Sequence, residues 1–195
     1  HIDMTSQFQN STSVKINGHD IEALNNTVAA IQSEPSLAKT TFRANGRWID
    51  DRLVRTSIAS FRGGGVEQER PQAHELQTDL PLALLGQDRG PSPLELALSA
   101  LASCVTTTLA SHAAARGFQL DALDVHVEGT LDLQGFLGLD ENVRPGYRKI
   151  QVDIHLESAA TAEEEEEFIR LAIAFSPLWD LFQNGADLET MTHLS

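Results

Sequence analysis

Cys104 is the residue with the most distinctive chemistry in this sequence, because it is the only cysteine among 195 residues. It ends the stretch PSPLELALSALASC, which occupies positions 91–104. An ionised thiol attacks electrophiles, whereas a buried free thiol behaves as a small apolar side chain. The chemistry open to Cys104 therefore depends on whether polar groups reach the sulfur.

A long helix over residues 93–116 is predicted to carry this cysteine. Ser92 suits the N-cap, Pro93 suits the first helical position, and Glu95 lies three residues after the cap, as in a capping box. Gly117 ends the pattern, as glycine commonly does after a helix. The chain is therefore expected to enter and leave this helix at defined points.

Cys104 lies where this helix changes from apolar to polar. Residues 94–105 are apolar nearly all round, which predicts burial on all sides. Three threonines at 106–108 follow, and then Ser111 and His112. His112 is about 12 Å further along the helix than Cys104. It cannot be a direct base for the thiol, so an activating group must come from elsewhere in the fold or from another subunit.

Other catalytic and binding motifs are missing from the sequence. The seven histidines show no H-x-x-x-H spacing and there is no cysteine pair, so no metal site is expected. The glycines at 63–65 lack the strand and helix of a phosphate-binding loop, and no G-x-S-x-G elbow occurs. We therefore expect neither a metal nor a bound cofactor.

The charge balance excludes several classes of partner. With 28 acidic and 14 basic residues the net charge is −14. Such a surface repels nucleic acid and anionic membranes.

A lone cysteine argues against a disulfide framework and favours a reducing, cytoplasmic setting. No signal peptide is evident, and no uninterrupted apolar run reaches 18 residues, so no membrane span is expected.

Hydrophobic periodicity predicts a mixed chain of the α+β class. Apart from the central helix, the expected helices cover residues 20–33, a segment capped by Thr161 with Glu164, and a short segment from Ser176 to Gly185. The expected strands cover residues 39–50, 52–61, 73–80, 123–134, 148–158 and 188–194. Residues 63–65 and 135–147 are expected to be loops.

Three regions follow from this pattern. Residues 1–16 are interpreted as a tag remnant followed by a flexible tail. Residues 17–36 are expected to form an N-terminal helical extension. Residues 37–195 are expected to form the main domain.

The stretch RGPSPLELALSALASCVTTTLASHAAARGFQLDALDVHVEG, residues 89–129, resembles the OsmC/Ohr proteins, which are thiol enzymes that detoxify hydroperoxides. The proline–x–glutamate–leucine entry into a helix with a reactive cysteine carries the likeness, together with the strand GFQLDALDVHVEG. The resemblance extends more loosely over residues 38–195. It implies an OsmC-like fold, in which two β-sheets wrap around buried central helices in an intertwined homodimer with active sites at the interface.

The resemblance also assigns roles to individual residues. Cys104 matches the peroxidatic cysteine, which attacks the O–O bond of an organic hydroperoxide and becomes a sulfenic acid. Ser176, in Ala174-Phe175-Ser176-Pro177, stands where the family has its second, resolving cysteine. The cycle therefore needs an external thiol reductant.

The activating groups of the family are matched less directly. Leu94 stands where peroxidase members have a glutamate, and the neighbouring Glu95 is a candidate support that its capping role also explains. Arg47, in ANGRW, is the nearest match to the arginine that activates the thiolate. Arg52, Arg55 and Arg62 are alternatives.

Three functions remain open on these grounds. The first is a one-cysteine peroxidase that reduces organic hydroperoxides through Cys104. The second is a non-catalytic member that binds a small hydrophobic ligand at the dimer interface, with Cys104 as a packing residue. The third is another thiol chemistry, such as thioester or thiol transfer.

Overall fold

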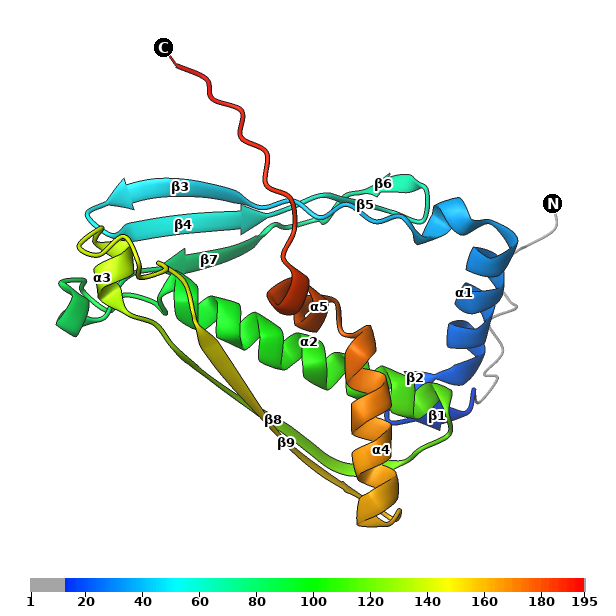
Figure 1. Cartoon of the computed structure of the whole chain (residues 1–195). Helices are drawn as coiled ribbons and strands as arrows, with labels where there is room; N and C mark the ends of the chain where they lie inside the picture. The colour runs from blue at the N-terminus through cyan, green and yellow to red at the C-terminus, as the bar shows by residue number, and fades with distance from the viewer. Residues whose placement is uncertain (1–12, 195) are drawn as a thin grey trace, which may run out of the picture.

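A central helix, α2 (Pro93–Ala115), organises the fold in a computed structural model that describes residues 13–194. It crosses a long antiparallel pair of strands, β8 (Leu120–Thr130) and β9 (Lys149–Ser158). Helices α4 (Ala162–Ala172) and α5 (Pro177–Asn184) pack against α2 and are joined by η3 (Ile173–Phe175). Figure 1 shows the β8–β9 ribbon beneath α2.

The chain before α2 forms small sheets and one helix. The elements in order are β1 (Lys15–Ile16), β2 (His19–Asp20), α1 (Ile21–Ser33), η1 (Pro35–Ala38), β3 (Asn45–Asp50), β4 (Leu53–Ile58), β5 (Phe61–Gly63), β6 (Val66–Gln68), β7 (His74–Thr78) and η2 (Leu82–Leu84). Strands β3, β4 and β7 form an antiparallel sheet in that order, while β1–β2 and β5–β6 are hairpins. In Figure 1 the β3–β4–β7 sheet lies above α2, on the side away from β8–β9.

The predicted start and end of α2 are confirmed. The Ser92 hydroxyl accepts from the Glu95 amide at 3.2 Å, and the Glu95 carboxylate accepts from the Ser92 amide at 2.7 Å. Gly117 has a φ of +73° just past the helix, a conformation that glycine adopts at little cost. Thr161 and Glu164 make the same reciprocal pair at the start of α4, also as predicted.

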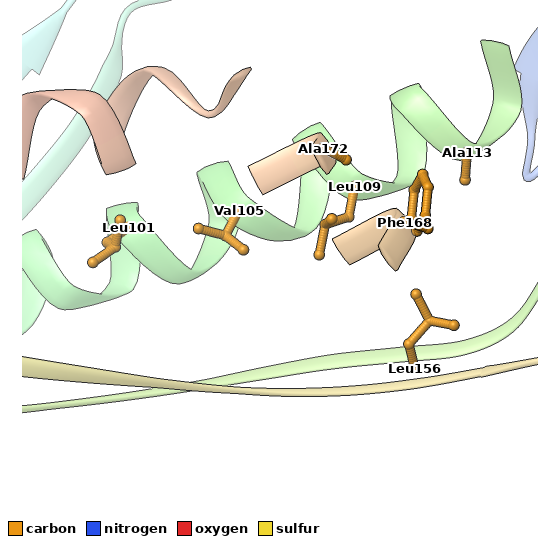
Figure 2. Packing of buried hydrophobic residues seen from close by; sticks show 7 residues of the cluster. All are labelled: Leu101, Val105, Leu109, Ala113, Leu156, Phe168 and Ala172. Carbon is orange, nitrogen blue, oxygen red and sulfur yellow. The ribbon is translucent and has the colours of Figure 1, made fainter. Parts of the chain in front are cut away.

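The buried core follows one row of α2. Leu101, Val105, Leu109 and Ala113 recur every fourth residue, so they lie along one side of the helix. Phe168 of α4 and Leu156 of β9 close over this row, and Figure 2 shows their side chains converging near Leu109. Helix α2 is therefore held by a single seam of apolar contacts within the chain.

The expected burial of residues 94–105 on all sides is wrong for the single chain. Only 17% of the most apolar 18-residue window of α2 is buried, although the helix is long and apolar enough, by length and composition, to cross a membrane. Ala100, Ser103 and Thr107 lie on an exposed side of the helix. The strand β8 and the helices α4 and α5 pack against other parts of α2 and leave this side exposed.

Several predicted strands and loops need correction. Residues 188–194 were expected to form a strand but form none, because no other strand pairs with them and Leu188 is 94% exposed. The 63–65 loop is the turn of the β5–β6 hairpin, where Gly64 and Gly65 take φ values of +60° and +80°. The 135–147 loop includes the end of a short helix, α3 (Leu133–Phe136).

The remaining helix predictions agree with the structure, while strand boundaries shift. Helix α1 begins after Asp20, whose carboxylate accepts from the Ala23 amide. The strand expected over 39–50 begins only at Asn45, the one expected over 52–61 divides into β4 and β5, and the one expected over 123–134 covers 120–130. The flexible tail expected at the N-terminus falls mostly on residues outside the described part of the chain.

A buried ion pair holds the loop that enters α2. The Asp79 side chain is fully buried and accepts from Arg89 Nε at 2.7 Å and from the Leu80 amide at 2.8 Å. The hydrogen bond from the Arg89 side chain lowers the pKa of Asp79 most, and the bonds from the Leu80 and Arg89 amides lower it further. The pKa of Asp79 therefore lies below its ordinary value of 3.8. Asp79 thus links the two ends of the loop that delivers the chain to Ser92.

We predict that Asp79→Asn destabilises the protein by about 1–3 kcal/mol at neutral pH, since Arg89 loses a charged partner. Because the folded carboxyl has the lower pKa, its contribution is present above about pH 4 and is lost as the pH falls through the folded value. Urea unfolding of Asp79→Asn should therefore show a smaller loss of stability on acidification than the parent. Asp88→Asn, an exposed substitution on the same loop, is the control; equal acid sensitivity in parent and Asp79→Asn would contradict the prediction.

Candidate thiol site

The structure brings Cys104 and Ser176 together across 72 positions of sequence. Ser176 is fully buried, and its hydroxyl donates to the Cys104 sulfur at 3.4 Å. Cys104 lies midway along α2 and is partly exposed. The pair lies where the chain leaves η3 and begins α5 beside α2.

Ser176 has two roles at this junction. As the N-cap of α5, its hydroxyl oxygen accepts from the Trp179 amide at 3.4 Å, and Pro177 occupies the first helical position. Its hydroxyl hydrogen remains free to bond the sulfur. The Cys104 sulfur therefore lies beside a hydrogen-bond donor and beside the first turn of α5.

Glu95 is placed at the cap of α2 rather than beside the sulfur. Its carboxylate bonds Ser92, and the Ser92 backbone and side chain keep the pKa of Glu95 below its ordinary value. Leu94 precedes it on the exposed first turn. Glu95 also helps, after burial, to raise the pKa of the Tyr147 hydroxyl.

Arg47 lies on β3, exposed to solvent, opposite Arg55 of β4. Within residues 13–194 no hydrogen bond or ion pair joins Cys104 to Arg47, Arg52, Arg55 or Arg62. Arg52 instead bonds Asp51, and Arg62 donates to the Gly65 carbonyl. The arginine that would activate the thiolate is thus not brought to it by the single chain.

The polar end of α2 is occupied by other contacts. His112 stacks on Phe175 with ring centroids 4.9 Å apart, and burial, followed by the nearby Arg116, lowers the pKa of His112. His19 lies 3.1 Å from the Ser111 hydroxyl. These side chains tie α2 to η3 and to the N-terminal hairpin, which agrees with the expectation that His112 is not a base for Cys104.

The N-terminal hairpin docks onto the turn after α2. The Asn17 side chain donates to the Phe118 carbonyl at 2.9 Å and accepts from the Leu120 amide at 2.9 Å. Asn17 has a φ of +50°, which asparagine tolerates better than most residues. One side chain thus satisfies both backbone groups as a neighbouring strand would.

An open cavity of about 640 Å³ lies near the thiol. It includes Leu101, three residues before Cys104, and Trp179, three residues after Ser176, while its rim carries Arg144 and Arg148. From the sequence, Arg144 was expected in the loop 135–147 and Arg148 at the start of the strand 148–158, and the positive charge that they share was overlooked. The signal was present in RPGYRK, residues 144–149, where three basic residues and no acidic one occur in six positions.

Among residues 13–194, no group of three histidine, cysteine, aspartate or glutamate side chains is arranged to hold a metal ion. Among these residues the hydrogen-bond partner of the Cys104 sulfur is the Ser176 hydroxyl.

We predict that Ser176→Cys forms a disulfide with Cys104 on mild oxidation, because the hydroxyl already lies 3.4 Å from the sulfur. Intact mass and loss of free thiol measure the bond. Ser111→Cys is the matched control: it lies about 10 Å along α2 from Cys104, too far for a disulfide. Two free thiols in oxidised Ser176→Cys would show that the two side chains do not meet in solution.

Comparison with known proteins identifies the fold and the family of the chain. No curated protein matches the sequence. The structure resembles an OsmC-like protein from Mycoplasma pneumoniae, with a TM-score of 0.55, 20% identity, and coverage of 74% of this chain and 88% of that one. It also resembles an organic hydroperoxide resistance protein from Elizabethkingia anophelis, with a TM-score of 0.51, 17% identity, and coverage of 74% and 89%. The sequence model described as OsmC-like protein matches residues 86–191, more than half of the chain, and the chain therefore belongs to the OsmC-like family.

Proposed function

We propose that the protein reduces organic hydroperoxides through Cys104, with an external thiol as reductant. The Cys104 thiolate attacks the outer peroxide oxygen, the O–O bond breaks, and the alcohol leaves after taking a proton. The sulfur, oxidised by two electrons, becomes a sulfenic acid. One external thiol then forms a mixed disulfide and releases water, and a second thiol restores Cys104 and leaves as a disulfide.

The Ser176–Cys104 contact is the observation that carries this proposal. In a family of redox proteins, the lone cysteine is the residue to which a buried hydroxyl donates. A hydroxyl donor stabilises a thiolate, and it can equally bond a sulfenate oxygen once the sulfur is oxidised. Serine cannot form a disulfide, so Ser176 supports a cycle resolved by an outside thiol, as a reducing compartment such as the cytoplasm supplies.

A homodimer is part of the proposal. The uncovered side of α2 and exposed aromatic side chains such as Phe42 and Trp48 leave apolar surface in contact with water in the single chain. A second copy would cover them, and it could bring Arg47 or one of its alternatives to Cys104.

A second candidate function is binding without catalysis. The cavity beside Leu101 and Trp179 has the volume of a small-molecule site, and Glu95 is committed to its capping box. In that case Cys104 is a packing residue, and the protein acts by binding a small hydrophobic ligand in the cavity. The two candidates differ in whether the sulfur is oxidised by peroxide.

We predict that Cys104→Ser abolishes consumption of cumene hydroperoxide in the presence of dithiothreitol, while the far-ultraviolet spectrum stays unchanged. Ser176→Ala should slow the reaction about tenfold, because one hydrogen bond to the charged sulfur is lost. Ser103→Ala, on the exposed side of the same turn, is the control. If the parent neither consumes peroxide nor gains an oxygen on Cys104 by mass, the binding function stands instead.

We predict that sedimentation equilibrium gives twice the mass of one chain. Ala100→Arg should dissociate the dimer, because it places a long cation on the exposed side of α2. Ala115→Arg, at the exposed end of the same helix, should leave the dimer intact. A parent protein that sediments as a stable monomer would contradict the dimer.

A further inference from the structure

The cavity beside the first half of α2 has apolar walls drawn from three elements. Its volume of about 640 Å³ lies within the range of small-molecule sites. The walls comprise Leu94, Ala97 and Leu101 of α2, Ile150 and Val152 of β9, and Trp179, Leu181 and Phe182 near α5. The α2 residues recur at helical spacing along about 10 Å of that helix. The shape therefore suits a chain-like apolar group laid along α2.

The mouth of this cavity is basic in an acidic protein. Arg144, Arg148 and Lys149 line it and are exposed, while the chain as a whole carries a net charge of −14. Within residues 13–194 none of these three side chains takes part in an ion pair. Ion pairs within the described residues therefore do not explain why these three basic side chains lie together.

Arg148 lies directly before β9, which begins at Lys149. Ile150 and Val152 of β9 belong to the apolar wall, and Arg148 lines the same cavity. An exposed cation therefore adjoins the apolar wall both in sequence and in the lining of the cavity.

Tyr147 fixes this basic segment against α2. Its hydroxyl donates to the Leu94 carbonyl at 3.0 Å. Its ring lies over Gly129, where an added Cβ would come within 2.8 Å of the ring carbons. The glycine allows the close approach, so the segment that directly precedes Arg148 is held against the first turn of α2 rather than forming a free loop.

We propose that this cavity binds a single-chain anionic amphiphile, with its alkyl chain along α2 and its carboxylate at Arg148 and Arg144. Guanidinium groups pair with carboxylates through two parallel hydrogen bonds, which makes arginine suited to this head group. Neither Cys104 nor Ser176 lines the cavity. The proposal therefore goes beyond the thiol chemistry and does not depend on it.

The fluorescence of Trp179 can report on binding once the other tryptophan is removed. Trp48→Phe leaves Trp179 as the only tryptophan, because the chain has two. Decanoate, decanol and decylammonium are titrated below their aggregation concentrations. We expect decanoate to change the emission of Trp179 at the lowest concentrations, decanol at higher ones and decylammonium at the highest. The ratio of the affinities for decanoate and decanol should fall as salt is added, because salt screens the charges.

Substitutions at the mouth identify the head-group contact. The double variant Arg144→Gln and Arg148→Gln should bind decanoate about tenfold more weakly while binding decanol unchanged. Arg170→Gln, on the exposed surface of α4, should change neither affinity. Cys104→Ser should bind decanoate as the parent does, so a failure of the peroxidase proposal leaves this one intact.

Three results would overturn the proposal. Equal affinity for decanoate and decanol, or an unchanged preference in the double variant, would remove the head-group role of the arginines. If no amphiphile alters the emission of Trp179 and Phe182→Asp dissociates the dimer, the cavity is the seat of a second copy instead.

Discussion

Helix α2 carries more apolar surface than the rest of one chain covers. Its buried row packs on β8, β9 and α4 through residues such as Val105 and Leu109, while its opposite side stays open. Apolar surface left uncovered on a long helix is a common mark of an interaction site. The position of the thiol, the cavity beside it and the proposed pairing of two chains all follow from this one imbalance.

The thiol lies at the boundary between the covered and uncovered parts of that helix. Val105 is next to Cys104 in sequence and fully buried, whereas Ser103 on its other side is exposed. Cys104 is therefore held by the core and remains within reach of small molecules. The buried hydroxyl of Ser176 donates a hydrogen bond to the sulfur and so fixes its position against the start of α5.

Short-range signals predicted the local structure well. Ser92 with Glu95 and Thr161 with Glu164 mark helix starts because their contacts span only three residues. The strand expected over 188–194 failed for the opposite reason: alternation is a local pattern, but a strand also needs a neighbour that the local pattern cannot supply.

The candidate site was only partly predictable. The family resemblance, rather than spacing or periodicity, linked Ser176 to Cys104, since 72 positions separate them. No local pattern in the sequence indicates where Arg47 of β3 lies relative to the sulfur on α2. At the cavity, a hydrogen bond joins Tyr147 to the first turn of α2, although 53 positions separate the two residues. No pattern within either segment indicates that contact.

The side chain of Asn17 has a consequence for the motions of the protein. It is the hydrogen-bond acceptor for the Leu120 amide, which begins β8. When the N-terminal hairpin lifts away, that amide loses its partner and its proton can exchange with water, while amides deeper in β8 keep their strand partners. The exchange rate of one backbone proton therefore reports how often the extension detaches, independently of whether the rest of the domain opens.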